Sequence, residues 1–152
     1  MESMNKKVLI AGTFDLIHPG HLFLINEAAK LGDVCVIVST DKNRELYSGE
    51  APIIPEAQRL KVIKGIKNVK VARLGRSDND TLKTVEEINP DIILLGPDQK
   101  YDLDTLKEGL KKLGLEHIII QRLKLYCDDC ELHSSGLIKQ KIIERFQNKS
   151  SE

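Results

Sequence analysis

The sequence contains no tryptophan, and aromatic residues make up only 4% of its 152 residues. This scarcity argues against a protein that stacks single-stranded bases on aromatic platforms. Net charge is missing too, because 23 lysines and arginines balance 23 aspartates and glutamates. A strongly basic field that would attract nucleic acid over the whole surface is therefore absent, and any basic patch must be local.

Long hydrophobic runs are also missing. The longest ones, such as VCVIV and IILLG, fall far short of the roughly 18 apolar residues that a membrane span needs. The opening MESMNKK contains no apolar stretch of the signal-peptide kind. Three cysteines without a secretory signal predict a reduced, cytoplasmic protein.

The remaining composition is typical of one folded domain. An apolar fraction of 41% and a charged fraction of 30% fit a globular chain that is long enough to bury a core. The chain shows no repeat, no linker and no segment of contrasting composition. We therefore expect a single domain over residues 1–152, with residues 1–6 and 148–152 as frayed tails.

Short apolar stretches alternate with helical ones along the whole chain. We expect strands at residues 7–11, 34–40, 69–74, 91–95 and 117–121. We expect helices at residues 19–31, 55–67, 80–88, 103–113 and 135–146. This alternation predicts an α/β fold, a Rossmann-like, three-layer, doubly wound parallel sheet of five strands. The first strand should lie centrally, and ligands should bind beyond the carboxyl ends of the strands.

Residues 12–21, GTFDLIHPGH, follow the first strand and match neither the dinucleotide fingerprint nor the P-loop. Gly12 would let a ligand approach the backbone closely, and Thr13 offers a hydroxyl and an amide at the same place. His18 and His21 bracket a helix start, where free amides and the helix dipole favour an anion. Their imidazole N–H groups would donate to phosphate oxygens and to charge that develops in a transition state.

Two other interpretations of these histidines are open. His-x-x-His can be half of a metal site, although no third ligand is close in the sequence. Either histidine could also simply cap the helix or pack, which is common for a single histidine. No serine or cysteine is paired with a base, so covalent catalysis is not indicated. Direct in-line attack of a substrate phosphate on the α-phosphorus of a nucleotide is the economical reaction.

The same stretch closely resembles the G-x-F-D-x-x-H-x-G-H signature of the cytidylyltransferase-like nucleotidyltransferases. The matching positions are Gly12, Phe14, Asp15, His18, Gly20 and His21. The resemblance implies a fold of the nucleotidyltransferase type and a nucleotide site that includes Gly12, Phe14 and Gly20. It also implies that His18 and His21 contact the triphosphate and stabilise the transition state, and that Thr13 helps to bind phosphate.

The second signature of these enzymes opens their last helix, and HSSGLIK, residues 133–139, stands in that place. Ser134 or Ser135 can cap the helix, and the amides there can hold the β- and γ-phosphates. Lys139 can add positive charge one turn further on, although many relatives have arginine there. An ordinary serine cap is the simpler alternative.

Two more basic residues lie where the superfamily places functional ones. Lys42 follows the second strand, where a lysine often contacts the phosphates, and we list it among the catalytic candidates. Arg59 stands on the next helix, where relatives carry an arginine, and we expect it to bind substrate. Each of them alone would more commonly be a solvated surface charge.

Three further stretches resemble the archaeal-type FAD synthetases, which transfer AMP from ATP to FMN. They are APIIPEAQR, NPDIILLGPDQKYDLDTL and CDDCELHSSGLIKQKIIERF, at residues 51–59, 89–106 and 127–146. The resemblance implies that Asp98 contacts the nucleotide and the acceptor substrate. We also expect Tyr126, one of the few aromatic residues that could stack on a flavin, to contact the acceptor. It implies ATP and FMN as small-molecule partners, with Mg²⁺ or another divalent cation. We expect no nucleic acid and no membrane as partners, and we expect a homodimer.

Alternative functions are open at this stage. A CTP-dependent cytidylyltransferase acting on glycerol 3-phosphate or a similar small phosphate fits the scarcity of aromatic residues, because few candidates besides Tyr101 and Tyr126 could stack on a flavin. A nucleotide-binding regulator without catalysis is the other alternative, against which the intact histidine pair argues. Cys127 and Cys130 form a C-x-x-C that could bind a metal, respond to oxidation or be structural.

Overall fold

The computed structural model of the chain describes residues 5–99, 102–127 and 129–150. Its centre is one parallel sheet of five strands in the order β3-β2-β1-β4-β5. The strands are β1 Lys7–Gly12, β2 Asp33–Val38, β3 Val69–Leu74, β4 Ile92–Leu95 and β5 Ile119–Arg122. Val8 of β1 pairs with Val34 on one side and Ile92 on the other, so the first strand is central. The predicted parallel sheet and its central first strand are confirmed.

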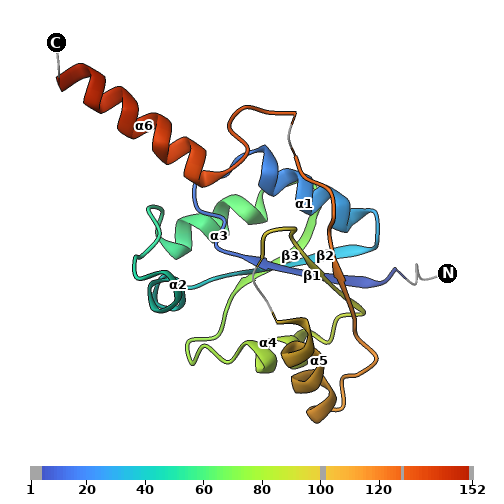
Figure 1. Cartoon of the computed structure of the whole chain (residues 1–152). Coiled ribbons are helices and arrows are strands. Elements are labelled where there is room, and N and C mark those ends of the chain that lie inside the picture. The colour runs from blue at the N-terminus through green and yellow to red at the C-terminus, as the bar shows by residue number, and fades with distance from the viewer. Residues whose placement is uncertain (1–4, 100–101, 128, 151–152) are drawn as a thin grey trace.

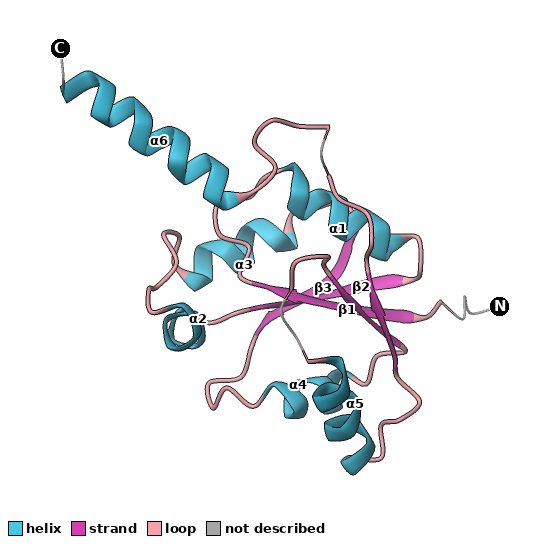
Figure 2. Cartoon of the chain, in the orientation of Figure 1, coloured by secondary structure: helices cyan, strands magenta, loops and turns pink. Residues whose placement is uncertain are grey.

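The helices cover both faces of this sheet. They are α1 Pro19–Ala29, α2 Asp41–Ser48, α3 Glu56–Lys64, α4 Thr81–Ile88, α5 Leu103–Lys112 and α6 Ser135–Ser150. Figure 2 shows α1 and α3 above the sheet and α4 and α5 below it, while α6 extends away from the body. The three layers of the predicted doubly wound fold are therefore confirmed. No helix within the described ranges is both long enough and apolar enough to cross a membrane.

Alternation along the strands divides the core in two. Val8 and Ile10 of β1 point to one face, where they pack with Ile25 of α1 and Ile63 of α3. Leu9 points to the other face, where a separate cluster includes residues from α4 and α5. Most strand residues of β1, β2 and β4 are buried, as expected for a sheet covered on both sides. The polar chemistry is thereby left to the loops at the strand ends.

One helix was not predicted. The segment after β2 reads from the sequence as a polar connection, yet Asp41–Ser48 forms α2. The Thr40 side chain caps it by accepting a hydrogen bond from the Asn43 backbone N–H at 3.1 Å, and Gly49 ends it at φ 84°. None of its residues is buried, so the apolar periodicity that reveals a helix is absent.

The ends of the chain differ in part from the expected tails. Helix α6 continues to Ser150, past residue 146 where the sequence pattern predicts its end. Of the expected tails, residues 1–4 and 151–152 lie outside the described residues.

Candidate nucleotidyl-transfer site

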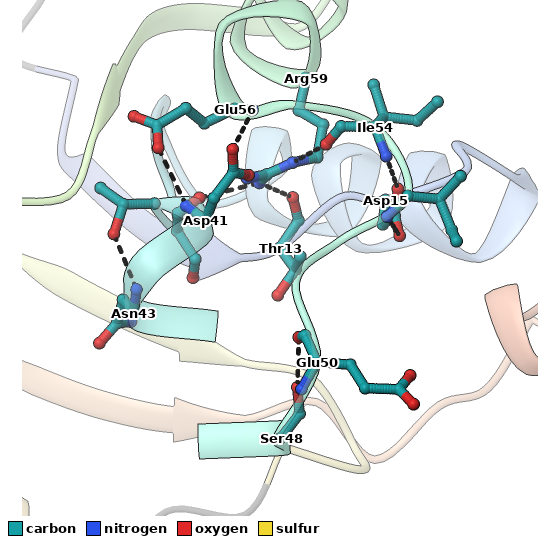
Figure 3. A network of polar contacts seen from close by, with 12 residues as sticks. Thr13, Asp15, Asp41, Asn43, Ser48, Glu50, Ile54, Glu56 and Arg59 are labelled. Atoms are coloured by element: carbon teal, nitrogen blue, oxygen red, sulfur yellow. Dashed lines mark hydrogen bonds and ion pairs between the residues drawn. The ribbon is translucent and has the colours of Figure 1, made fainter. Parts of the chain in front are cut away.

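The loop that follows β1 has an unusual backbone. Phe14 and Leu16 have φ values of 55° and 49°, in the left-handed region that bulky side chains rarely adopt. The buried carboxylate of Asp15 holds this conformation by accepting hydrogen bonds from the backbone N–H groups of Ile53 and Ile54 at 2.8 and 2.9 Å. Figure 3 shows Asp15 reaching the segment that carries Ile54. Such strained backbone is concentrated at functional sites.

His18 and His21 form a reciprocal cap at the start of α1. His18 Nδ1 accepts a hydrogen bond from the Gly20 backbone N–H at 3.1 Å. His21 Nδ1 accepts one from the His18 backbone N–H at 3.3 Å. The two rings stack with their centroids 3.7 Å apart. Because Nδ1 is the acceptor in both neutral rings, the proton of each lies on Nε2, which is left to donate outward.

This cap changes which groups can donate hydrogen bonds to an anion at the start of α1. The sequence interpretation relies on free amides at the helix start together with the imidazoles. Here the amides of His18 and Gly20 are already used by the imidazoles. The donors that remain are the Nε2–H groups, and the helix dipole adds its positive end behind them.

Both histidines are neutral at physiological pH. Burial lowers the pKa of His18, and nearby His133 lowers it further. Burial lowers the pKa of His21 to about 4, helped by His18 and opposed by the carboxylate of Asp15. A neutral imidazole keeps its single N–H for a ligand, so these rings donate hydrogen bonds without carrying a full charge.

The lowered pKa of His21 predicts acid-sensitive folding. The unfolded chain binds a proton below pH 6.5 and the folded chain only below about 4. Stability contributed by this residue is therefore complete above pH 6.5 and lost as the pH falls towards 4. We expect urea unfolding to show that the free energy of unfolding falls by up to about 3 kcal/mol through this group. In His21→Gln, which cannot titrate, the corresponding part of the loss between pH 7 and pH 4.5 should vanish; an unchanged pH dependence contradicts the assignment.

A polar pocket of about 220 Å³ opens beside this cap. It is lined by Thr13, Phe14, Asp15, His21, Arg44, Ser48, Glu50, Ala51, Pro52, Ser135 and Lys139. The two sequence signatures, more than 100 residues apart, thus contribute to one pocket. Hydroxyls, an imidazole and two cationic side chains face the same space, which suits a polyphosphate.

The start of α6 brings the second signature into place. Ser134 Oγ accepts a hydrogen bond from the Leu137 backbone N–H at 3.2 Å, so Ser134 is the residue that caps the helix. Ser135 and Lys139 then line the pocket. Gly20 allows this close approach, because a Cβ at that position would come within 2.5 Å of the His133 carbonyl oxygen. The glycine of the first signature therefore makes room for the second.

Arg59 lies beneath the site and does not line the pocket. Its side chain is only 1% exposed. Its guanidinium donates hydrogen bonds to the carbonyl oxygens of Thr13, Ser39 and Ile54 at 2.6, 2.8 and 2.7 Å. It also donates to the Asp41 carboxylate at 2.7 Å (Figure 3). Arg59 thereby ties the ends of β1 and β2 to the segment before α3, and we assign it a positioning role rather than substrate contact.

Several other residues expected in the site do not line the polar pocket. Gly12 lies at the end of β1, where a Cβ would come within 3.1 Å of the Phe14 ring. Lys42 is exposed on α2 and does not line the polar pocket. Asp98 and Tyr126 follow β4 and β5 and meet outside this pocket, where the Tyr126 hydroxyl donates to Asp98 at 3.2 Å. Tyr101 lies outside the described residues.

Sequence reasoning missed Arg44, Ser48 and Glu50 as pocket residues. Arg44 and Ser48 stand one turn apart on α2, the helix without an apolar pattern. The signal that could have found them is the pair of helix boundaries around them, the capping Thr40 and the terminating Gly49.

The cysteine segment forms a cluster of its own. The ligand atoms of Cys127, Asp129 and Cys130 lie within 4.8 Å of one another. A hydrogen bond to the Asp129 carboxylate, burial and nearby Cys130 raise the pKa of Cys127 to about 11. Its thiol is therefore protonated at neutral pH, which disfavours reactions of the thiolate.

The sequence profile of the cytidylyltransferase-like family matches residues 9–141. The chain belongs to the cytidylyltransferase-like family. Its relatives within this family include the FAD synthase of Methanobrevibacter smithii, 46% identical over 90% of both chains. The FAD synthase of Ferroglobus placidus is 44% identical over 91% of this chain and 88% of its own length. The predicted resemblance to this family and to its archaeal FAD synthetases is confirmed.

Solved structures support the fold assignment. The lipopolysaccharide core biosynthesis protein from Thermoplasma volcanium superposes with a TM-score of 0.74 at 40% identity, over 80% of this chain and 98% of that one. Pantoate-beta-alanine ligase from Francisella tularensis, solved with an ATP analogue and beta-alanine, reaches a TM-score of 0.53 at 14% identity. It covers 84% of this chain and 62% of its own, and at this identity the likeness concerns the fold alone.

Proposed function

We propose that this chain is an FAD synthase, which transfers AMP from ATP to FMN and releases pyrophosphate. The observation that carries this proposal is the polar pocket where His21 of one signature meets Ser135 and Lys139 of the other. Relatives that are 40–46% identical over about nine-tenths of this chain and bear the name FAD synthase support the choice of substrates.

The chain's own groups position the reactants and stabilise charge. The triphosphate of ATP occupies the polar pocket, with Arg44 and Lys139 facing its oxygens and Ser135 donating from the start of α6. The Nε2–H groups of His18 and His21 donate to the α-phosphate as negative charge builds up on it. The FMN phosphate attacks the α-phosphorus in line, and the bond to the leaving pyrophosphate breaks. No covalent enzyme intermediate is needed.

A divalent cation fits the donor set of this pocket. Mg²⁺ prefers oxygen ligands and usually combines one or two carboxylates with substrate phosphates and water. Glu50 supplies a carboxylate on the pocket wall, whereas both oxygens of Asp15 already accept backbone hydrogen bonds. When bound, the cation would neutralise phosphate charge and orient the pyrophosphate for departure. Glu50 is the residue that we propose to hold it.

To test the choice of substrates, the protein is incubated under reducing conditions with Mg²⁺ and one of two pairs of nucleotide and acceptor. ATP with FMN should yield FAD and pyrophosphate in stoichiometric amounts, measured by chromatography and a pyrophosphate assay. CTP with glycerol 3-phosphate should yield no CDP-glycerol. The reverse result would identify a cytidylyltransferase, and nucleotide binding without either product would identify a non-catalytic regulator. A cytoplasmic location and the absence of nucleic-acid and membrane partners stay predictions.

We also propose a homodimer, built through α6. This helix extends from the body in Figure 1. Beyond Lys139, which lines the pocket, the same face of the helix continues with Ile142 and Ile143, which are 45% and 48% exposed. A single projecting helix is marginally stable in water, so its apolar stripe favours burial against a second copy of the chain.

Ile143→Glu is therefore expected to convert the dimer to a monomer with little effect on the folded sheet. Glu144→Lys, on the opposite side of the same helix, is the matched control and should stay dimeric. Light scattering after gel filtration gives the mass of each. A wild-type protein that is monomeric at micromolar concentration, or an Ile143→Glu variant that remains dimeric, contradicts this interface.

A further inference from the structure

A second, mostly apolar pocket of about 90 Å³ lies on the other face of the sheet. Its floor is made by aliphatic side chains from the strands and the helices below them, namely Leu9, Ala11, Ile37, Val85, Ile93, Leu95 and Leu106. Its rim is polar, with hydroxyls, two asparagines, Arg76 and Asp80. The phosphate chemistry described above uses none of these residues. The pocket therefore has the composition of a site for a ring that is apolar on its faces and polar at its edge.

Two side-chain oxygens on this rim have no hydrogen-bond partner in the part of the chain that the structure describes. Asn43 Oδ1 and Asn79 Oδ1 are buried and unpartnered among the described residues. Both residues line this pocket, and they come from different elements, α2 and the connection between β3 and α4. Buried carbonyl oxygens without a donor are rare, so their presence together at one pocket calls for an explanation by a ligand.

The backbone fixes both asparagines. The Asn43 backbone N–H donates to Thr40 Oγ1 at 3.1 Å, and the Asn79 backbone N–H donates to the Arg76 carbonyl at 3.1 Å. Asn79 has a φ of 60°, a left-handed conformation that asparagine tolerates better than most residues. The amides can still turn about their last side-chain bond, because that torsion is broad. Each oxygen can thus meet a donor that enters the pocket.

The two pockets flank the carboxyl ends of β1 and β2. Thr13, just after β1, faces the polar pocket, whereas Ser39 and Thr40, just after β2, face the apolar one. Arg59 holds the Thr13 and Ser39 carbonyls together. Helix α2 borders both pockets, since Asn43 lines one and Arg44 the other. A single ligand can therefore extend from the apolar pocket past α2 to the phosphate chemistry.

We propose that the apolar pocket holds the isoalloxazine ring of FMN, with Asn79 accepting the ring imide N–H and Asn43 accepting a ribityl hydroxyl. This assignment rests on the proposed FAD synthase function. The dimethylbenzene end of the flavin lies on the aliphatic floor, and the pyrimidine end meets the polar rim. Asn43 is the asparagine beside the phosphate pocket, so it meets the ribityl chain that leads to the phosphate. Adenine, which has no apolar end, fits this asymmetric lining less well.

Phosphate-free flavins isolate this pocket from the phosphate chemistry. We would titrate wild-type protein with riboflavin, 3-methylriboflavin, which lacks the imide N–H, and lumiflavin, which lacks the ribityl chain. Binding is followed by the change in flavin fluorescence, without any nucleotide. Riboflavin should bind on the order of tenfold more tightly than either analogue, the usual effect of one lost hydrogen bond to a buried partner.

Each asparagine should control one of these ratios. Asn79→Gly, which suits the left-handed backbone, should abolish the preference over 3-methylriboflavin and leave the preference over lumiflavin. Asn43→Ala should reduce the preference over lumiflavin and leave the other. Asn89→Gly, which replaces a second left-handed asparagine at φ 48° at the far end of α4, and Glu45→Ala on α2 are the matched controls. Both should keep the wild-type ratios.

Unchanged ratios in both asparagine variants overturn the inference, as does equal binding of all three flavins by the wild type. A rise in the KM for ATP with unchanged flavin binding would place adenine in this pocket instead. The proposed function fails separately, when flavins bind with these ratios but ATP and FMN give no FAD. FAD formation with unchanged ratios, in contrast, leaves the function standing and removes only this assignment.

Discussion

Replacing His18 or His21 with alanine is expected to lower the rate of FAD formation by about 10²- to 10³-fold. The two Nε2–H groups are the donors that remain once each Nδ1 has accepted a backbone hydrogen bond of the cap. They act on charge that exists only in the transition state, so kcat should fall more than the affinity for ATP. Steady-state kinetics with ATP and FMN measures both effects.

Alanine also removes the helix cap, so conservative variants are needed to separate the two roles. His18→Ser keeps a side-chain acceptor at the N-cap but offers no outward donor. We expect it to match the wild type in thermal stability while its rate falls as in His18→Ala. His21→Gln keeps the acceptor of a capping box and an N–H near the original Nε2, so it should recover part of the rate. Near-normal turnover in His18→Ser would mean that the ring serves only as a cap.

The central part of the site could be predicted because its chemistry is local in the sequence. Gly12 to His21 contain the strand end, the strained loop and the first helix turn within one short segment, and Ser134 and Ser135 open a helix of their own. A parallel sheet brings the carboxyl ends of its strands to one edge, so the sequence alone predicts that these segments lie together. The sequence pattern could not reveal that the imidazoles cap the helix with Nδ1, because the direction of a ring is set by packing.

Two other features could not be read from the sequence for identifiable physical reasons. Helix α2 has no buried residue, so it leaves no apolar period, and Arg44 was missed with it. The resemblance predicts Arg59 at the substrate, and the rarity of fully buried arginine would otherwise place it at the surface. Its burial depends on carbonyl oxygens from Thr13, Ser39 and Ile54, which become neighbours only in the folded chain.

The unpartnered oxygens of Asn43 and Asn79 show that a candidate binding site can be visible in the structure without any signal in the sequence. Asn43 and Asn79 both lie in stretches that read from the sequence as polar connections, where asparagine is common. Only the folded structure shows that their oxygens are shielded from water beside one pocket. An unsatisfied polar group is a property of three-dimensional packing, so it can mark a binding site that no motif announces.

Arg59→Met should destabilise the folded protein by about 3–5 kcal/mol, because three backbone carbonyl oxygens lose their donor and each unpaired group costs about 1–3 kcal/mol where it is shielded from water. Methionine fills much of the same volume but leaves the carbonyl oxygens of Thr13, Ser39 and Ile54 and the Asp41 carboxylate without their donor. For a chain of this size the melting temperature should fall by about 10 °C or more. Urea unfolding and a thermal melt measure the two quantities.

Variants around Arg59 distinguish a structural role from substrate contact. Lys61→Met, an exposed position on the same helix, controls for the loss of one positive charge and should change stability by less than about 1 kcal/mol. Arg59→Lys keeps the charge but cannot reproduce the planar guanidinium that reaches several acceptors. Its free energy of unfolding should therefore lie between those of Arg59→Met and Lys61→Met. If Arg59 instead contacted substrate, Arg59→Met would raise a KM at unchanged stability. Because Arg59 joins the ends of β1 and β2 beneath both pockets, we expect stability and the rate of FAD formation to fall together.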